Sequence, residues 1–246
     1  MTATGMRSPL RRLAPAGIAL VLLGAQLALG LALERQRARP AGILPPPPSP
    51  RALLVRGLGD RQLAYRLGAL ELQEAGDGGG IVTPLLLYDY DRLAGWLDAV
   101  DRLDPKSGHV MAMATYYFAL ATDPAKVRRM VAFVVEAFER HPESRWRFLA
   151  HAAYLARFRL HDRAYALEIA RRLASLDIEG LPVWTKQMPA FVLADMGEDE
   201  AAADLMNAIL DSDPGLSSAE RRLMTDFIDR HRAADLNVDG LRRRKP

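Results

Sequence analysis

The sequence predicts an all-α fold made of about four pairs of helices and one final helix. Three observations predict it: four segments recur along the chain, their apolar residues share one helical phase, and most of the segments end at a proline. The segments cover residues 88–105, 125–142, 161–178 and 197–214, at offsets of 37, 36 and 36 residues. A period of this size is typical of stacked units, because each unit completes the burial of its neighbour's apolar face.

Each of these segments is expected to form a helix that buries one stripe of side chains. Steps of three and four residues keep side chains on one face of a helix. The positions in the shared phase are Leu93, Leu97, Val100, Met130, Val134, Ala137, Ala166, Ala170, Leu173, Ala202, Met206 and Ile209. Pro105, Pro142 and Pro214 are expected to end their helices, because proline lacks a donor and disfavours helix in the residue before it.

A second apolar run precedes each of these segments and is expected to form the first helix of a pair. These runs cover residues 58–75, 107–122, 143–159 and 182–196, and short polar breaks separate the two members of each pair. Asp or Thr at the breaks can cap the next helix, and Pro124 suits a first helical position. A charged final helix over 217–234 is expected to close the stack toward water.

The segments 88–105 and 197–214 resemble the second half of tetratricopeptide repeats. Asp89 and Tyr90 match the opening of that family's pattern in the first segment, and Gly197, Ala202 and Pro214 match it in the last. In the middle segments Met130 stands where the family prefers Ala, and Ile178 replaces the proline. The period also exceeds the family's ~34 residues. The resemblance covers roughly residues 58–234 and implies a TPR-like α-solenoid with a C-terminal capping helix. It implies no particular ligand, because such repeats are platforms for many partners.

A generic all-α bundle would also show apolar stripes and is the alternative. The phase shared by four segments, with three terminal prolines, favours the repeat.

The N-terminal part of the chain is expected to anchor the protein in a membrane. Residues 13–33 carry no charge and follow Arg7, Arg11 and Arg12. As a helix this run would be roughly 30 Å long, which matches the hydrocarbon core of a bilayer. A secretory signal peptide cut after residue 30 is the alternative. The apolar run continues beyond that point and exceeds a typical signal core, which favours an uncleaved transmembrane helix.

The expected layout is a cytoplasmic tail over residues 1–12, the transmembrane helix 13–33, a Pro-rich linker 34–52, the helical-repeat domain 53–236 and a basic tail 237–246. The prolines at 45–48 favour polyproline II, which acts as a semi-rigid spacer. Because long downstream domains translocate largely regardless of charge, the repeat domain is expected in the periplasm of a bacterial envelope, on a single-pass inner (cytoplasmic) membrane anchor. A domain facing the cytoplasm is the alternative.

The charge distribution argues against nucleic-acid binding. The pI is near 9.3, but six arginines and one glutamate fall in the first 50 residues, so the remainder is close to neutral. A phosphate backbone requires a basic field that this part lacks. Cysteine is absent from the sequence, which excludes thiol catalysis and disulfides.

The sequence contains no motif that points to catalysis, a cofactor or a metal. The five histidines form no pair one helical turn apart of the kind that binds zinc. No serine occupies a Gly-x-Ser-x-Gly turn. We therefore expect no catalytic residues, no cofactor and no metal, and do not expect an enzyme.

Partner-binding residues are expected on the first helices of the pairs, which line the concave surface in proteins of the resembling family. Aromatic residues and arginines are enriched where proteins bind partners. The candidates are Tyr116, Arg145, Arg147, His151, Trp184 and Gln187. Tyr116, Tyr117 and Phe118 cannot all face one way on a helix, so at least one of them is expected to be exposed.

These expectations combine into a membrane-anchored helical-repeat scaffold that mediates protein-protein interaction in the cell envelope. Its partner would be a protein or peptide of a membrane complex. The alternative is a membrane-bound enzyme acting on an envelope polymer, which would need acidic residues or histidines converging in a cleft.

Overall fold

The computed structural model describes the backbone of residues 10–36, 43–78 and 81–242, and side-chain exposure for residues 17–31, 43–76 and 83–233. The chain divides into two compact units, residues 1–42 and residues 43–246. Parts of the expected N-terminal tail (1–9), of the linker (37–42) and of the basic tail (243–246) lie outside the described residues.

The described part of the first unit is one helix, α1 (Leu10–Gln36), which includes the whole run expected to span the membrane. Over the residues that the structure describes, no helix is both long enough and apolar enough to cross a membrane.

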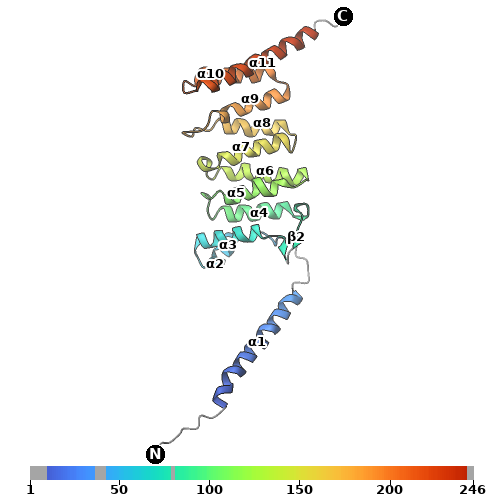
Figure 1. The fold of residues 1–246 in the computed structure, drawn as a ribbon, viewed down its shortest axis with the longest axis vertical. Coiled ribbons are helices and arrows are strands. Elements are labelled where there is room, and N and C mark those ends of the chain that lie inside the picture. The colour runs from blue at the N-terminus through green and yellow to red at the C-terminus, as the bar shows by residue number, and fades with distance from the viewer. Residues whose placement is uncertain (1–9, 37–42, 79–80, 243–246) are drawn as a thin grey trace, which may run out of the picture. The chain divides into compact units, whose positions relative to one another are not determined.

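The second unit is almost entirely helical, which confirms the all-α prediction (Figure 1). Its α-helices are α2 (Pro50–Arg56), α3 (Arg61–Gln73), α4 (Tyr90–Asp101), α5 (His109–Ala112), α6 (Pro124–Phe138), α7 (Pro142–Phe158), α8 (Arg163–Ala174), α9 (Trp184–Met196), α10 (Asp199–Ser212) and α11 (Ser218–Arg242). Short 3-10 helices cover η1 (Leu85–Leu87) and η3 (Phe118–Leu120), and η2 (Met113–Tyr117) is a π-helix. A two-residue antiparallel pair, β1 (Asp77–Gly78) with β2 (Ile81–Val82), follows α3.

Side chains of aspartate begin several of these helices. Asp60, Asp89, Asp123 and Asp162 each accept a hydrogen bond from a backbone N–H in the first turn of α3, α4, α6 and α8, respectively. These bonds satisfy donors that have no partner within the helix. Pro124 takes the first position of α6, as the sequence predicts.

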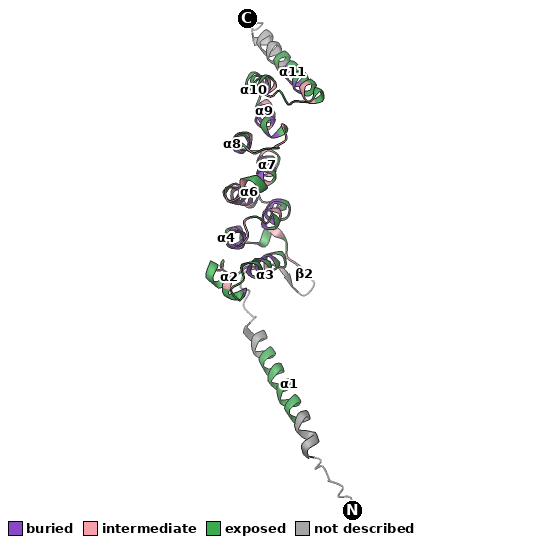
Figure 2. Cartoon of the chain, turned by 90° about the vertical axis from the view of Figure 1, so that its left-hand side faces the viewer, coloured by how far each residue is buried: buried purple, intermediate pink, exposed green. Residues whose placement is uncertain are grey.

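The core of the second unit lies between two layers of helices. Helices α4, α6, α8 and α10 form one layer, on the left in Figure 2 and here called the back layer; α3, α7, α9 and α11 form the other, on the right and here called the front layer. Consecutive helices pack against one another along the unit. The short run α5–η2–η3 belongs to the front layer by its place in the chain and by its contacts with α7. Every position of the shared apolar phase is buried in the back-layer helices, which confirms the predicted stripes.

The Pro-rich segment differs from the expected spacer, because part of it packs on α4. Leu44 is buried, and the indole Nε1–H of Trp96 donates to the carbonyl of Pro45 at 2.8 Å. Gly95 admits the ring of Pro47: a Cβ there would lie 2.6 Å from its Cγ. Residues 43–49, here called the Pro-rich strap, therefore belong to the folded unit. Sequence composition favours an extended conformation but does not show which helix receives it.

The C-terminal end also differs from expectation. The last helix extends to Arg242, so residues 237–242 of the expected basic tail continue α11. This stretch contains no proline, so no residue in it lacks the backbone donor that a helical hydrogen bond needs.

Candidate functional site

Exposed apolar side chains are distributed unequally between the two layers. Among the described residues, none of the exposed large apolar side chains lies on α4, α6, α8 or α10. Those on the front layer are Leu63, Leu67, Leu70, Tyr116, Tyr117, Leu120, Tyr154, Phe158, Trp184, Met196 and Leu223. Contiguous exposed apolar surface marks interaction sites more often than isolated apolar residues do. The front layer is therefore the candidate binding surface.

Five ring side chains form a connected row along the middle of this layer. The aromatic row consists of Tyr116, Phe148, His151, Tyr154 and Phe158. The ring centroids of Tyr116 and His151 lie 4.7 Å apart, those of His151 and Tyr154 5.4 Å, and those of Tyr154 and Phe158 4.7 Å. Phe148 lies 6.1 Å from Tyr116. Such centroid distances are typical of favourable aromatic contacts.

The π-helical turn η2 positions one end of the row. Met113, Ala114 and Thr115 are buried, whereas Tyr116 and Tyr117 are exposed and Phe118 is again buried. The prediction that at least one of these three consecutive aromatics is exposed is thus confirmed. π-helical turns are rare and often occur at functional sites. Here the turn places two tyrosines on the surface of the front layer.

A pocket of about 300 Å³ opens beside the row, between η2–η3 and α7. It is lined by Thr115, Tyr116, Ala119, Leu120, His151, Tyr154, Leu155 and Arg159. Two of the predicted partner-binding residues, Tyr116 and His151, are thus brought together in one cavity. Burial lowers the pKa of His151 below its ordinary value, because desolvation disfavours the charged imidazolium. The ring is therefore neutral at pH 7.

A second aromatic contact lies between the starts of α7 and α9. The rings of Trp146 and Trp184 are 5.7 Å apart, and the guanidinium of Arg147 lies 4.3 Å from the Trp146 ring centroid. Trp146 is buried, while Arg147 and Trp184 are exposed. Arg147 and Trp184 therefore also belong to the surface of the front layer.

The remaining two predicted residues are buried, which revises the expectation for them. Gln187 is 4% exposed. Arg145 is 1% exposed, and its guanidinium binds both carboxylate oxygens of Asp101, at 3.0 and 2.6 Å, and the carbonyls of Ala137 and Pro105. Neither side chain reaches the surface that a partner would contact. Arg145 instead joins α7 to α4 and α6.

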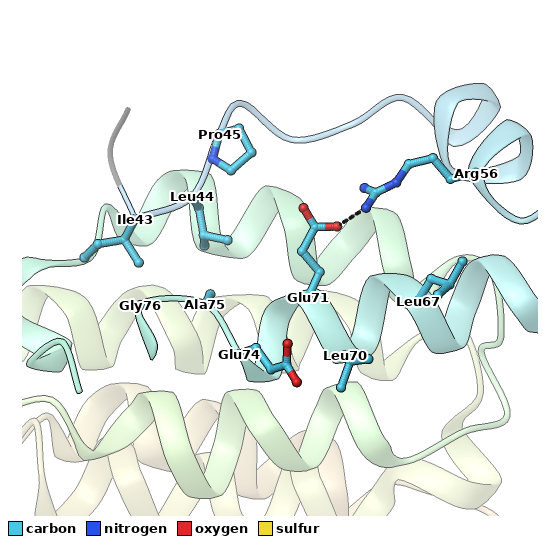
Figure 3. A pocket seen from close by; sticks show the side chains of 10 residues that line it. All are labelled: Ile43, Leu44, Pro45, Arg56, Leu67, Leu70, Glu71, Glu74, Ala75 and Gly76. Carbon is cyan, nitrogen blue, oxygen red and sulfur yellow. Dashed lines mark ion pairs between the residues drawn. The ribbon is translucent and has the colours of Figure 1, made fainter. Parts of the chain in front are cut away.

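A second pocket, of about 370 Å³, lies at the N-terminal end of the second unit, where the Pro-rich strap passes over α3 (Figure 3). Two carboxylates, Glu71 and Glu74, line it together with apolar side chains of α3 and of the strap. Arg56 holds Glu71 in an ion pair at 2.5 Å. The pocket therefore does not present two free carboxylates to a substrate.

Several surface residues of the pocket and of the aromatic row were missed by the sequence analysis. Leu120, Tyr154 and Arg159 line the same pocket as the predicted Tyr116 and His151, and Phe158 packs against Tyr154. On α7, the steps from 151 to 154 and 158 are three and four residues, which place these side chains on one helical face. That spacing was a usable signal for Tyr154 and Phe158.

Comparison with known protein families, with curated proteins and with solved structures finds no match.

Proposed function

We propose that this protein is a membrane-tethered helical-repeat scaffold, a TPR-like α-solenoid that binds a protein partner of the cell envelope through its front layer. The observation that carries the proposal is the unequal distribution of exposed apolar side chains. The helices of the back layer expose none in the described residues, whereas the front layer exposes several, among them Tyr116, Tyr154 and Phe158 of the connected aromatic row.

The composition of the front layer supports binding of a protein. Tyrosine, tryptophan and arginine are the residue types that contribute most to protein interfaces. Tyr116, Tyr154 and Trp184 are exposed, and Arg147 is exposed beside the tryptophan pair. Aromatic side chains lose little conformational entropy on binding, so they form rigid contact sites.

The proposed tether is the uncharged run 13–33, which lies within α1. Anchoring at the inner (cytoplasmic) membrane would raise the local concentration of the domain near membrane-bound partners, so a weak contact would suffice. The protein would act by position: it would hold a partner at the membrane, with the helical domain in the periplasm. A reporter enzyme that is active only after export, fused after Pro246, tests this orientation.

Site-specific photocrosslinking of the full-length protein in native membranes tests the proposed surface. A photoreactive residue at Tyr116 or Tyr154 should give a discrete crosslinked product, and mass spectrometry of that product identifies the partner. Matched controls are Glu136 and Glu168, which are exposed on α6 and α8 of the back layer. Equal crosslinking from both layers, or crosslinking from the back layer alone, would contradict the proposal.

A further inference from the structure

The pocket beside the aromatic row combines an apolar interior with aromatic walls. Ala119 and Leu155 are buried and form its floor, while Tyr116, Tyr154 and Leu120 are exposed at its edge. Its volume of about 300 Å³ is at the lower end of the range for ligand pockets. This shape favours insertion of one apolar side chain over binding of a large cofactor.

Arg159 gives the pocket one fixed positive charge. Its Nη2 donates to the carbonyl of Ala121 at 2.8 Å and to that of Leu120 at 3.4 Å, just after η3. No carboxylate within the described residues pairs with it, and its Nε and Nη1 have no partner there. The neighbouring Arg157 differs, because it pairs with Asp195. Arg159 is thus held in place with an open hydrogen-bonding edge.

We propose that this pocket binds an extended peptide segment in which a large apolar side chain lies within two residues of an aspartate or glutamate. The apolar side chain enters between Tyr116 and Tyr154, and the carboxylate pairs with the open edge of Arg159. Arginine is well suited to this pairing, because its planar donors match a carboxylate. The inference rests on the proposed function and names the chemistry of the partner at the same surface.

The charge of the pocket favours a peptide over a lipid surface. Anionic membranes recruit clusters of four or more basic residues. Of the described side chains that line this pocket, only Arg159 carries a full charge at pH 7, since His151 is neutral. One cation beside an apolar cavity is complementary to a peptide that carries one carboxylate close to one large apolar side chain.

Selection from a phage-displayed library of random 12-residue peptides tests the inference. The target is the full-length protein in detergent, immobilised through its N-terminus. We expect the selected peptides to share an aromatic or aliphatic residue with Asp or Glu within two positions. The best peptide is then synthesised with a fluorophore, and its affinity is measured by fluorescence anisotropy.

Three variants should change this binding in different ways. Tyr154→Ser removes a wall of the pocket and should weaken binding about tenfold or more, as expected for a central aromatic contact. Arg159→Gln should weaken it by about two- to fivefold, the value of an exposed ion pair. Arg159→Glu should redirect the selection toward peptides with Lys or Arg. Arg51→Glu, on an exposed arginine of α2 outside the front layer, is the matched control and should leave both affinity and selection unchanged.

Each other outcome overturns the inference, and the outcomes separate it from the proposed function. If Tyr154→Ser lowers the affinity for the peptide but neither Arg159 variant does, the pairing of a carboxylate with Arg159 is wrong. The proposed binding surface would not be contradicted by that result. The same holds if no peptide is selected while crosslinking from Tyr116 still captures a partner. Displacement of the peptide by phosphatidylglycerol micelles, lost in Arg159→Glu, would assign the pocket to a lipid headgroup. The fold of each variant is checked first by circular dichroism. Gln keeps an N–H donor for the carbonyl of Ala121, so Arg159→Gln is expected to remain folded.

Discussion

Two arginines on one turn of α7 have opposite roles, which shows how burial decides what a side chain does. Arg145 is buried and binds Asp101, whose side chain is fully buried, while Arg147 lies exposed over Trp146. Arg140 also pairs with Asp101, at 2.6 Å, so one carboxylate neutralises part of the charge of two guanidiniums. A buried ion pair is costly to desolvate. Removing only one of its partners destabilises the fold further, because the remaining charge is then less well compensated.

Replacing Arg145 with alanine should therefore destabilise the fold strongly. We expect a loss of about 3 kcal/mol in the free energy of unfolding, because the buried Asp101 keeps only Arg140 as a cationic partner and the carbonyls of Ala137 and Pro105 lose their donor. Urea denaturation followed by circular dichroism measures this loss. Arg128→Ala is the control: it breaks the exposed pair with Asp162 and should cost about 1 kcal/mol or less. Similar losses in the two variants would contradict the structural role of Arg145.

His151 should make the domain less stable in mild acid. Its pKa is lowered in the folded state by burial, so the unfolded chain binds the proton more tightly. In the window between the folded pKa and the ordinary value near 6.5, stability falls as the pH falls, and it is restored above that window. Thermal unfolding between pH 5 and pH 8 measures the effect, with His151→Gln as comparison. The variant should show a smaller decrease of Tm in acid, and an unchanged pH profile would refute the assignment to this residue.

Sequence reasoning found Tyr116 and His151 but could not distinguish Arg145 from Arg147. The two arginines are two residues apart, with Trp146 between them, and no local pattern shows which one meets Asp101. That contact depends on a residue 44 positions away in the chain. Arg159 was missed for a similar reason. Its role in the pocket depends on the carbonyls of Leu120 and Ala121, which orient its side chain, and on the lack of a paired carboxylate among the described residues.

At the scale of elements, the back-layer helices were predictable and the front layer was less so. Helices α4, α6, α8 and α10 have one buried face each, so their apolar residues keep a clear helical period. The front-layer run from His109 to Leu120 instead passes from α-helix through a π-turn to a 3-10 helix. Aromatic residues occur on both the buried and the exposed faces of this run, so the apolar pattern does not reveal where the helix geometry changes.

The Pro-rich strap is the element whose packing the sequence did not show, and its attachment to α4 can be tested. The chain contains no cysteine, so Leu44→Cys introduces a single thiol at a buried position. Adding Trp96→Phe removes the donor to Pro45, a bond worth about 1 kcal/mol, and should speed thiol labelling about fivefold. Gly95→Ala should also speed it, because the added Cβ meets the Pro47 ring.

A cysteine at the exposed Val55 is the control for this experiment and should be labelled rapidly in every background. A Leu44→Cys thiol that is labelled as fast as the Val55→Cys thiol without any second change would show that the strap does not pack on α4 in solution.

At the scale of the whole second unit, helices contact mainly their neighbours in the chain. The strongest packing joins α6 to α7, α7 to α8, α8 to α9, α9 to α10 and α10 to α11. In an arrangement of this kind, stability is close to a sum of local terms, and the loss of one end spreads only a short distance. A compact globular core would behave differently, because its parts unfold together.

Removal of α11 by a stop codon after Gly215 therefore separates these two kinds of fold. The truncation uncovers α10 and deletes His231, whose ring lies 2.5 Å from the carboxylate of Asp199, and Phe227, which packs against Phe191. We expect hydrogen exchange to accelerate strongly in α10 and weakly in α9. Helices α4 and α6 should keep their protection, because their main packing is with each other, with α3 and with α7. Amide exchange followed by mass spectrometry resolves these helices. His231→Ala in the full-length chain should produce a smaller acceleration confined to α10 and α11. Uniform loss of protection from α4 to α10 would show a single cooperative core and would remove the basis for a repeat architecture.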